Sequence, residues 1–169
     1  MRLFIAINFN TETKSRLLAL RDGLRSKSGG GNFSLPENLH LTLVFLGECD
    51  AREAAAIKSV MDAVSFEPFE IAIDRVGRFR RDDGDIWWAG VKESKALAGL
   101  QRELQDRLTE VGFYIENRKY SPHITLGRRV ITDEKPWGIE AFGEKAAGID
   151  LMLSERVNGR LTYSVIHHR

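Results

Sequence analysis

The chain has 169 residues, the length of one compact domain, and its 43% hydrophobic and 29% charged residues are the composition of an ordinary globular protein. Twenty-five basic and 24 acidic residues give a net charge of +1, which argues against a long basic surface for extended nucleic acid, so a nucleic-acid partner should be bound at one end or over a few nucleotides. No apolar run reaches the roughly 18 residues that cross a bilayer, and the single cysteine, Cys49, excludes a disulfide framework and fits a reducing cytoplasm.

Hydrophobic periodicity separates helices from strands in the first half of the chain. Short apolar runs mark the strand candidates, and apolar residues recur every three or four residues in the helix candidates. The predicted elements are a strand at 2–8, a helix from its N-cap Thr11 to about Lys27, a flexible glycine-rich loop at 29–32, a strand at 39–46 and a helix at 51–63 capped by Asp50.

The second half repeats this mixture of helices and strands. The predicted elements are strands at 69–76 and 86–91 joined by a hairpin turn at 80–85, a helix at about 95–111 opened by Ser94, a strand at 122–127, a loop or short irregular helix at 132–146, and strands at 148–154 and 161–166 joined by a turn at Asn158-Gly159. Helices interspersed among mostly antiparallel strands indicate the α+β class.

Two of the predicted strands begin with the same pattern, His-apolar-Thr-Leu. One contains His40 and Thr42, and the other contains His123 and Thr125, 83 residues further on. Each half of the chain has a helix, a loop and then such a strand. This organisation predicts a single bilobal domain over residues 1–169, in which two similar lobes bring the motif strands together across a cleft.

The pattern places one imidazole and one hydroxyl on the same face of each strand, because side chains alternate along a strand. Imidazoles titrate near neutral pH, and hydroxyls are neutral hydrogen-bond donors. One imidazole can take a proton from water while the other protonates a leaving oxygen, and the hydroxyls can bind phosphate oxygens. The pair therefore predicts a phosphoesterase that needs no metal or other cofactor, and leaves open which imidazole is the acid.

Other interpretations of these residues are weaker. A single His-x-Thr is more often structural, but two copies in a chain with four histidines and seven threonines favour a function. Two histidines without acidic or cysteine partners at ligand spacing make a poor metal site. Nothing in the sequence indicates an activated thiol at Cys49, and His167 and His168 are expected in a solvated tail.

Several segments of the sequence resemble a known family. The segments Arg2–Ile7, Asn38–Glu48 and Ser121–Arg128 are similar to the 2H phosphoesterase superfamily, and within it to bacterial and archaeal RNA 2′,3′-cyclic phosphodiesterases, historically called 2′-5′ RNA ligases. Trp87–Val91 and Leu153–Tyr163 also fit that family. The resemblance implies a bilobal α+β fold with pseudo-two-fold duplicated antiparallel sheets, flanking helices and an active-site cleft between the lobes.

The resemblance also implies an activity, namely hydrolysis of a terminal RNA 2′,3′-cyclic phosphate to a 2′-phosphate. It makes His40 the proton donor to the departing O3′ and His123 the proton acceptor from water, with Thr42 and Thr125 binding the phosphate. The implied partners are RNA 3′ ends with a cyclic phosphate, tRNA-derived ends among them. We expect a cytoplasmic monomer without a membrane partner.

Phe45 and Arg128 stand five residues after the motif histidines, where similar proteins contact the terminal nucleoside. Strict alternation puts both on the face opposite the histidines and assigns Phe45 to the core, so a bulge or twist near Gly47 and Gly127 would be required for binding. Four arginines of the predicted hairpin either guide RNA or form a solvated turn with nearby aspartates; they are Arg75, Arg78, Arg80 and Arg81.

Two further functions remain open on the sequence. The same histidines could catalyse the reverse reaction, which joins RNA halves such as tRNA-half-like ends through a 2′-5′ linkage. A nucleotide-binding module without turnover is the other alternative, although retention of both histidines and both threonines disfavours it.

Overall fold

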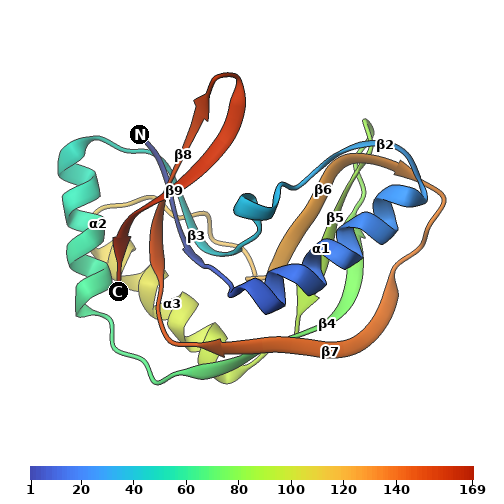
Figure 1. Ribbon diagram of the computed structural model, residues 1–169. Helices are drawn as coiled ribbons and strands as arrows, with labels where there is room; N and C mark the ends of the chain where they lie inside the picture. The colour runs from blue at the N-terminus through green and yellow to red at the C-terminus, as the bar shows by residue number, and fades with distance from the viewer.

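Strand pairing divides the backbone into two antiparallel sheets (Figure 1). The computed structural model describes all 169 residues, with a four-stranded sheet in the order β3-β1-β8-β9 and a five-stranded sheet in the order β2-β6-β5-β4-β7. The strands are β1 (Arg2–Ile7), β2 (Ser28–Phe33), β3 (Leu41–Glu48), β4 (Phe69–Phe79), β5 (Asp85–Val91), β6 (His123–Thr132), β7 (Trp137–Ala146), β8 (Asp150–Val157) and β9 (Arg160–His168).

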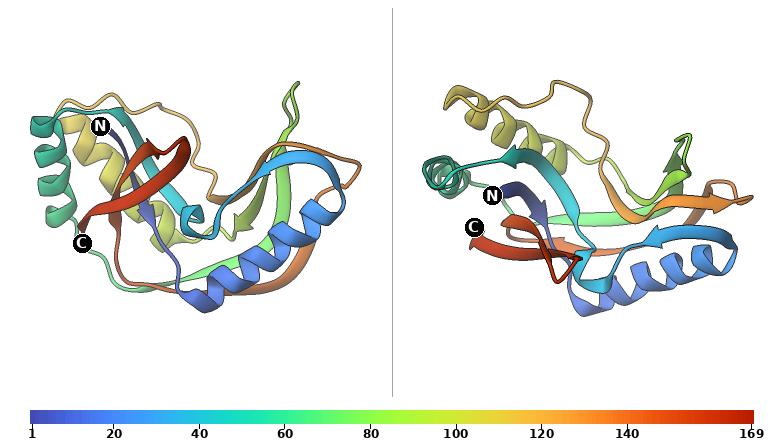
Figure 2. Two further views of the ribbon diagram at one scale, coloured as in Figure 1. Left: turned by 45° about the horizontal axis from the view of Figure 1, so that its top comes forward. Right: turned by 90° about the horizontal axis from the view of Figure 1, so that it is seen from above.

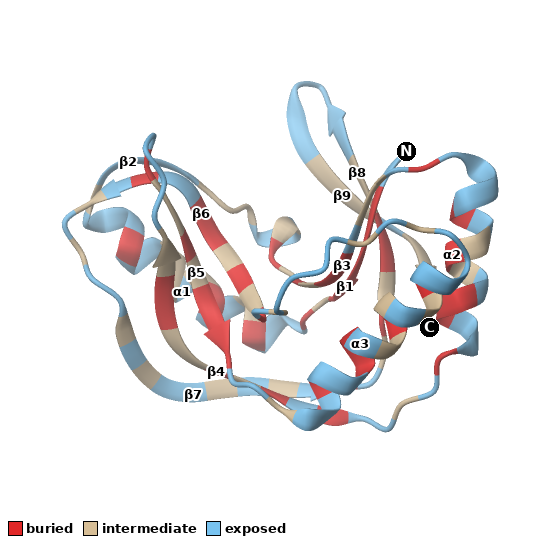
Figure 3. Ribbon diagram, turned by 180° about the vertical axis from the view of Figure 1, so that it is seen from behind, coloured by how far each residue is buried: buried red, intermediate tan, exposed pale blue.

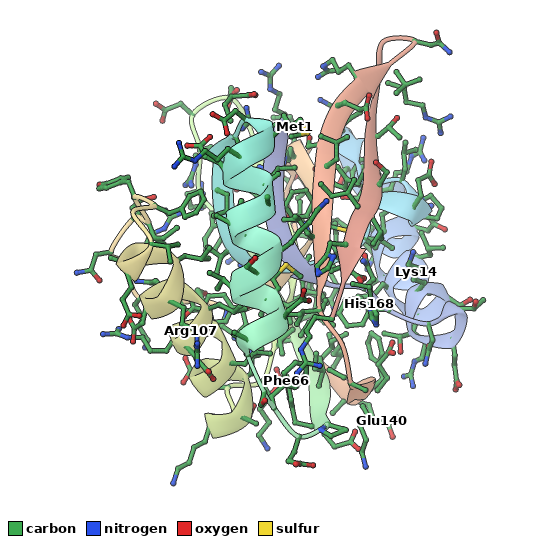
Figure 4. The ribbon with its side chains drawn as sticks, turned by 90° about the vertical axis from the view of Figure 1, so that its left-hand side faces the viewer. Met1, Lys14, Phe66, Arg107, Glu140 and His168 are labelled. Atoms are coloured by element: carbon green, nitrogen blue, oxygen red, sulfur yellow. The ribbon has the colours of Figure 1, made fainter.

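Three α-helices flank the sheets, and this confirms the predicted α+β class. The helices are α1 (Thr11–Ser26), α2 (Ala51–Ala63) and α3 (Lys95–Glu110), with a short 3-10 turn, η1 (Pro36–Asn38), before β3. Helix α1 packs on the five-stranded sheet against β2, β6 and β7, whereas α2 and α3 lie side by side at the four-stranded sheet (Figures 1 and 4). None of the helices is long and apolar enough to cross a membrane.

The two sheets are duplicates in their strand order. In the four-stranded sheet β3 pairs with β1 and β1 with β8, and in the five-stranded sheet β6 pairs with β5 and β5 with β4, all antiparallel. The helix before each motif strand packs on the opposite sheet, because α1 precedes β3 and α3 precedes β6. The chain therefore passes back and forth between the sheets, and each sheet draws on both halves of the sequence.

A core of 33 buried residues spans both sheets and all three helices. Leu3 and Ile5 face it from β1, and Trp87 and Ile124, both fully buried, face it from the five-stranded sheet. Figure 3 shows buried residues along β1 and in bands along β6, as expected when one face of each strand packs inward. Because the core is shared, the positions of the two motif strands relative to one another are set by packing.

The helix starts agree with the sequence except at α1. The N-cap of α1 is Asn10 rather than Thr11, because the Asn10 side chain accepts a hydrogen bond from the backbone N–H of Thr13. Asp50 caps α2 in a complete capping box with Glu53, and the Ser94 hydroxyl caps α3.

The predicted loops at 29–32 and 132–146 are wrong, since these segments contain β2 and β7. Both are outermost strands of the five-stranded sheet. An edge strand is held by backbone hydrogen bonds to one neighbour and needs few apolar side chains, so glycines and a preceding proline are tolerated. At Gly143 the carbonyl of Ile71 in β4 comes so close that a side chain would collide with it.

The expected solvated tail at the C-terminus is also wrong. His167 and His168 belong to β9, and each contacts a carboxylate: His167 Nε2 lies 2.7 Å from Asp62 Oδ1 of α2, and His168 Nδ1 lies 2.6 Å from Asp150 Oδ1 of β8. These contacts fasten the last strand to the four-stranded sheet and its helix.

The capping box of α2 gives a test of local stability. We expect Asp50→Ala to lower the free energy of unfolding by about 1 kcal/mol and Tm by about 2–4 °C, because the backbone N–H of Glu53 loses its acceptor. Asp50→Asn, which keeps an acceptor oxygen, should retain most of the stability. Thermal unfolding followed by circular dichroism measures both, and equal losses in the two variants would contradict this assignment.

Candidate active site

The two motif segments have the same burial at each of seven successive positions. From Leu39 to Phe45 and from Pro122 to Arg128 the order is buried, half-buried, buried, half-buried, buried, buried, exposed. The half-buried positions are the histidine and the threonine of each motif. The predicted face-sharing of His40 with Thr42 and of His123 with Thr125 is therefore present in both strands.

A β-bulge interrupts the alternation directly after each motif threonine. On β3 the pairing with β1 passes from Thr42 to Val44, and on β6 the pairing with β5 passes from Thr125 to Gly127, so one leucine is skipped in each case. A bulge shifts the following residues to the other face of the strand. Phe45 and Arg128 consequently return to the face of the histidines.

The core assignment of Phe45 by strict alternation is accordingly wrong. The Phe45 ring is 53% exposed, with the guanidinium of Arg2 5.1 Å from its centroid. Arg128 is exposed and has no ion-pair partner. The sequence predicts a bulge or twist near Gly47 and Gly127 if these side chains bind the nucleoside. The bulges lie at Leu43, a few residues before Gly47, and at Leu126, next to Gly127.

Each imidazole is oriented by a main-chain carbonyl two residues earlier. His40 Nδ1 lies 2.8 Å from the carbonyl oxygen of Asn38, and His123 Nδ1 lies 2.6 Å from that of Ser121. A carbonyl can only accept, so Nδ1 carries the proton in both rings. In the neutral imidazoles Nε2 is therefore the basic nitrogen on both sides of the site.

The surroundings of the two Nε2 atoms differ. His40 Nε2 lies 2.9 Å from Thr42 Oγ1, and since this nitrogen is unprotonated in the neutral ring, the Thr42 hydroxyl donates to it. His123 Nε2 has no hydrogen-bond partner within the protein. The first imidazole is engaged by its own motif, and the second is free to contact a ligand or water.

Aromatic rings flank both imidazoles and help to remove them from water. Phe4 and Tyr163 lie 4.8 and 5.2 Å from His40 between ring centroids, and Phe79 and Trp88 lie 5.1 and 6.1 Å from His123. Burial lowers the pKa of His40 to about 4, and the nearby positive charges of His123, Arg128 and Lys14 act in the same direction against the Asn38 hydrogen bond.

Burial also lowers the pKa of His123, again with a contribution from Arg128. The neutral form of both imidazoles is thus favoured. An acid role for His40 calls for a nearby negative charge that favours the imidazolium.

A cavity of about 650 Å³ brings side chains of both sheets together. Thr42 and Phe45 of β3 line it, as do His123, Thr125 and Arg128 of β6. His40 is reached from it through the Thr42 hydroxyl, which contacts Nε2. The structure therefore brings the predicted site residues into one place.

Several residues of the site are missing from the sequence prediction. Tyr120 lines the cavity and donates its hydroxyl to the carbonyl of Thr42 at 2.8 Å, which ties the 113–122 segment to β3, and burial raises its pKa well above the usual range. Arg118 lines the cavity and lowers the pKa of His123 by its charge. No spacing rule identifies these two side chains, because the fold alone brings the segment to the site.

Three of the four hairpin arginines are engaged within the protein. Arg78 and Arg80 lie 4.0 and 3.3 Å from Asp85, and Arg75 pairs with Asp74 at 2.8 Å. Only Arg81 lines the cavity. The sequence leaves open whether these arginines guide RNA or form a solvated turn with nearby aspartates. The ion pairs of Arg75, Arg78 and Arg80 favour the solvated turn.

No group of three or more His, Cys, Asp or Glu side chains is arranged to hold a metal ion. Cys49 is buried behind β3, and burial raises the pKa of its thiol, so the protonated form is favoured. The titratable residues that line the cavity are His123, Tyr120, Glu116 and four cations, which are Arg81, Arg118, Lys119 and Arg128.

The sequence is similar to proteins of a known superfamily. The sequence profile of the 2′-5′ RNA ligase superfamily matches residues 11–151. A protein of Archaeoglobus fulgidus named RNA 2′,3′-cyclic phosphodiesterase is 32% identical over 151 residues, 85% of each chain. A protein of the same name from Thermotoga maritima is 35% identical over 131 residues, 76% of this chain and 70% of that one.

Solved structures agree with the sequence relatives. LigT of Escherichia coli in complex with 3′-AMP superposes with a TM-score of 0.88 at 25% identity, covering 99% of this chain and 96% of that chain. The protein TT0787 of Thermus thermophilus superposes with a TM-score of 0.86 at 25% identity and the same coverage. The similarity extends over both sheets.

The lowered pKa of His40 predicts a pH dependence of stability. The unfolded imidazole titrates near 6.5 and the folded one near 4, so between these values the unfolded state binds more protons and stability falls as pH falls. We expect a loss on the order of 2 kcal/mol from His40 between pH 7.5 and 4. Urea denaturation of wild type and of His40→Asn, which keeps a donor toward Asn38, measures this difference, and an identical pH dependence in the two proteins would contradict the assignment.

Proposed function

The chain belongs to the 2′-5′ RNA ligase superfamily, and from this membership we propose that it hydrolyses terminal RNA 2′,3′-cyclic phosphates to 2′-phosphates. The observation that carries the proposal is the repeated pair of one oriented imidazole and one threonine in two strands whose threonines line a single cavity. Two imidazoles and two hydroxyls match the two proton transfers and the two non-bridging oxygens of a cyclic phosphodiester.

In the proposed reaction His123 is the proton acceptor. Its Nε2 is basic and has no partner within the protein, so a water molecule can donate to it. As the water oxygen bonds to phosphorus, its proton moves to His123 Nε2. The P–O3′ bond breaks and O3′ takes a proton from His40 Nε2, leaving a free 3′-hydroxyl and a 2′-phosphate.

His40 must be protonated to serve as the proton donor, and the substrate can bring this about. A bound phosphodiester anion beside Nε2 favours the imidazolium and raises the pKa of His40 from its low value in the empty site. Protonation also removes the acceptor of the Thr42 hydroxyl, because Nε2 now carries a proton, which the proposed reaction directs at O3′. The Thr42 hydroxyl proton is then free to bind a phosphate oxygen.

The remaining site residues would hold the nucleotide. Thr125 supplies a second hydroxyl to the phosphate, as Thr42 does from the other sheet. The Arg128 guanidinium, which has no carboxylate partner, offers positive charge or a flat surface to the terminal nucleoside. The exposed ring of Phe45 can stack on its base.

Ligation would use the same site, with an RNA 5′-hydroxyl in place of the attacking water. The site chemistry is compatible with it, since a basic imidazole can take a proton from either oxygen. Incubation of a cyclic-phosphate oligonucleotide with and without a 5′-hydroxyl partner separates the two activities. A longer RNA as the main product would contradict the proposed hydrolysis.

Removal of either imidazole tests the mechanism. We expect His40→Ala and His123→Ala each to lower kcat by about 10²–10⁴-fold, because one proton transfer loses its donor or acceptor. His167→Ala, outside the cavity on β9, should retain turnover. Steady-state kinetics, with circular dichroism to verify folding, decides the matter. Near-full turnover by either motif variant would exclude the two-histidine mechanism.

The position of the phosphate in the product tests which ester bond breaks. We expect a 2′,3′-cyclic oligonucleotide to yield only the 2′-phosphate, because the proposed proton donor serves O3′. Phosphorus NMR of the product identifies the ester, and a 3′-phosphate would refute this part of the proposal.

A chelator tests whether the reaction needs a metal ion. Turnover should be unchanged after EDTA treatment and dialysis. EDTA inhibition that is reversed by added metal would refute the metal-independent mechanism.

A further inference from the structure

A second cavity, of about 710 Å³, adjoins the catalytic one. It lies between α3 and the 113–122 segment, which runs back along α3 toward β6 (Figure 2). The two cavities share five lining residues, so together they form one continuous groove; the shared residues are Gln101, Gln105, Arg118, Lys119 and Tyr120.

The second cavity concentrates positive charge in a chain whose net charge is only +1. Its charged lining consists of one acidic side chain, Glu93, and four basic ones, which are Lys95, Arg102, Arg118 and Lys119. Lys119 lies 3.9 Å from Glu93 and Arg118 lies 3.6 Å from Glu116, both in exposed pairs, whereas Lys95 has no carboxylate partner. Arg102 contacts Asp106 at 3.3 Å in an exposed pair of small energetic value, which a phosphate could replace.

The floor of the groove includes an exposed face of α3. Lys95, Gly99 and Arg102 are spaced four and three residues apart and so lie on one side of the helix, and Leu97, Gln101 and Gln105 line the groove beside them. A side chain at Gly99 would meet open space. The helix therefore presents bare backbone between two cations, with room for a chain to lie across it.

The junction of the two cavities offers an aromatic surface. The Tyr120 ring lines both cavities, and the hydrogen bond from its hydroxyl to Thr42 fixes its position. Single-stranded nucleic acid is bound by such a combination, in which cations follow the backbone and an aromatic ring stacks on a base.

We infer that this groove binds the RNA strand that precedes the terminal cyclic phosphate, its phosphodiesters contacting Lys95 and Arg102 on α3. The inference rests on the proposed function, because it takes the strand end to be in the catalytic cavity. The alternative path runs over the β4–β5 hairpin, where Arg78 and Arg80 share Asp85.

Kinetics on two substrates tests the groove. We expect the double variant Lys95→Ala/Arg102→Ala to raise KM about tenfold for a cyclic-phosphate oligoribonucleotide of about ten nucleotides. Its kcat and KM for a nucleoside 2′,3′-cyclic monophosphate should match the wild type, because neither side chain lines the catalytic cavity. The slope of log KM against log salt should fall by about 0.7 for each phosphate that the variant no longer neutralises.

Arg80→Ala is the matched control for charge, since it removes an exposed cation from the alternative path. We expect it to leave KM unchanged for both substrates. If Arg80→Ala raises the oligonucleotide KM as much as the double variant does, or if the double variant changes neither substrate or both equally, the groove proposal is wrong. A wild-type protein that hydrolyses neither substrate would instead overturn the proposed function and remove the premise of the groove.

A second variant blocks the groove without removing a cation. Gly99→Glu places a negative side chain on the floor and should raise the oligonucleotide KM by at least the same factor, with the mononucleotide unaffected. Gly23→Glu is its matched control, because Gly23 also lies within a helix, α1, and faces open space. Unchanged oligonucleotide kinetics in a folded Gly99→Glu protein would refute the path across α3.

Discussion

The hydrogen bond from each imidazole Nδ1 to a main-chain carbonyl is the interaction on which the site depends. It fixes the ring, assigns the proton to Nδ1, and leaves Nε2 as the reactive atom on both sides. Because the acceptors are backbone atoms of Asn38 and Ser121, the constraint comes from the path of the chain just before each motif residue. The two halves of the site are alike because the backbone is alike there.

The bulges after Thr42 and Thr125 extend the same constraint along the strand. Without them, only the histidine and threonine would face the cavity, and Phe45 and Arg128 would be on the core side. With them, Phe45 lines the cavity beside Thr42 on β3, and Arg128 lines it beside His123 and Thr125 on β6. A local irregularity of the ladder thus enlarges the site without loss of core packing.

The sequence predicts the parts of this protein whose signals are local. Alternation and capping residues locate most strands and helices, and the repeated motif predicts the His40–Thr42 and His123–Thr125 pairs, whose threonines line one cavity in the structure. The features that the sequence analysis did not predict are β2 and β7, the bulges and the position of Tyr120. They share one physical cause, since each is specified by a partner strand or a distant segment. Glycine-rich edge strands carry no apolar pattern, and a bulge has no fixed residue signature.

Burial of the imidazoles links the architecture to the proposed chemistry. Aromatic rings and the shared core exclude water from His40, and the surrounding cations oppose its protonation, so the neutral form of the imidazole is favoured. The same cations attract a phosphodiester anion, whose charge would then stabilise the imidazolium that the proposed reaction needs. Desolvation of His40 therefore links protonation of the proposed acid to binding of the substrate phosphate.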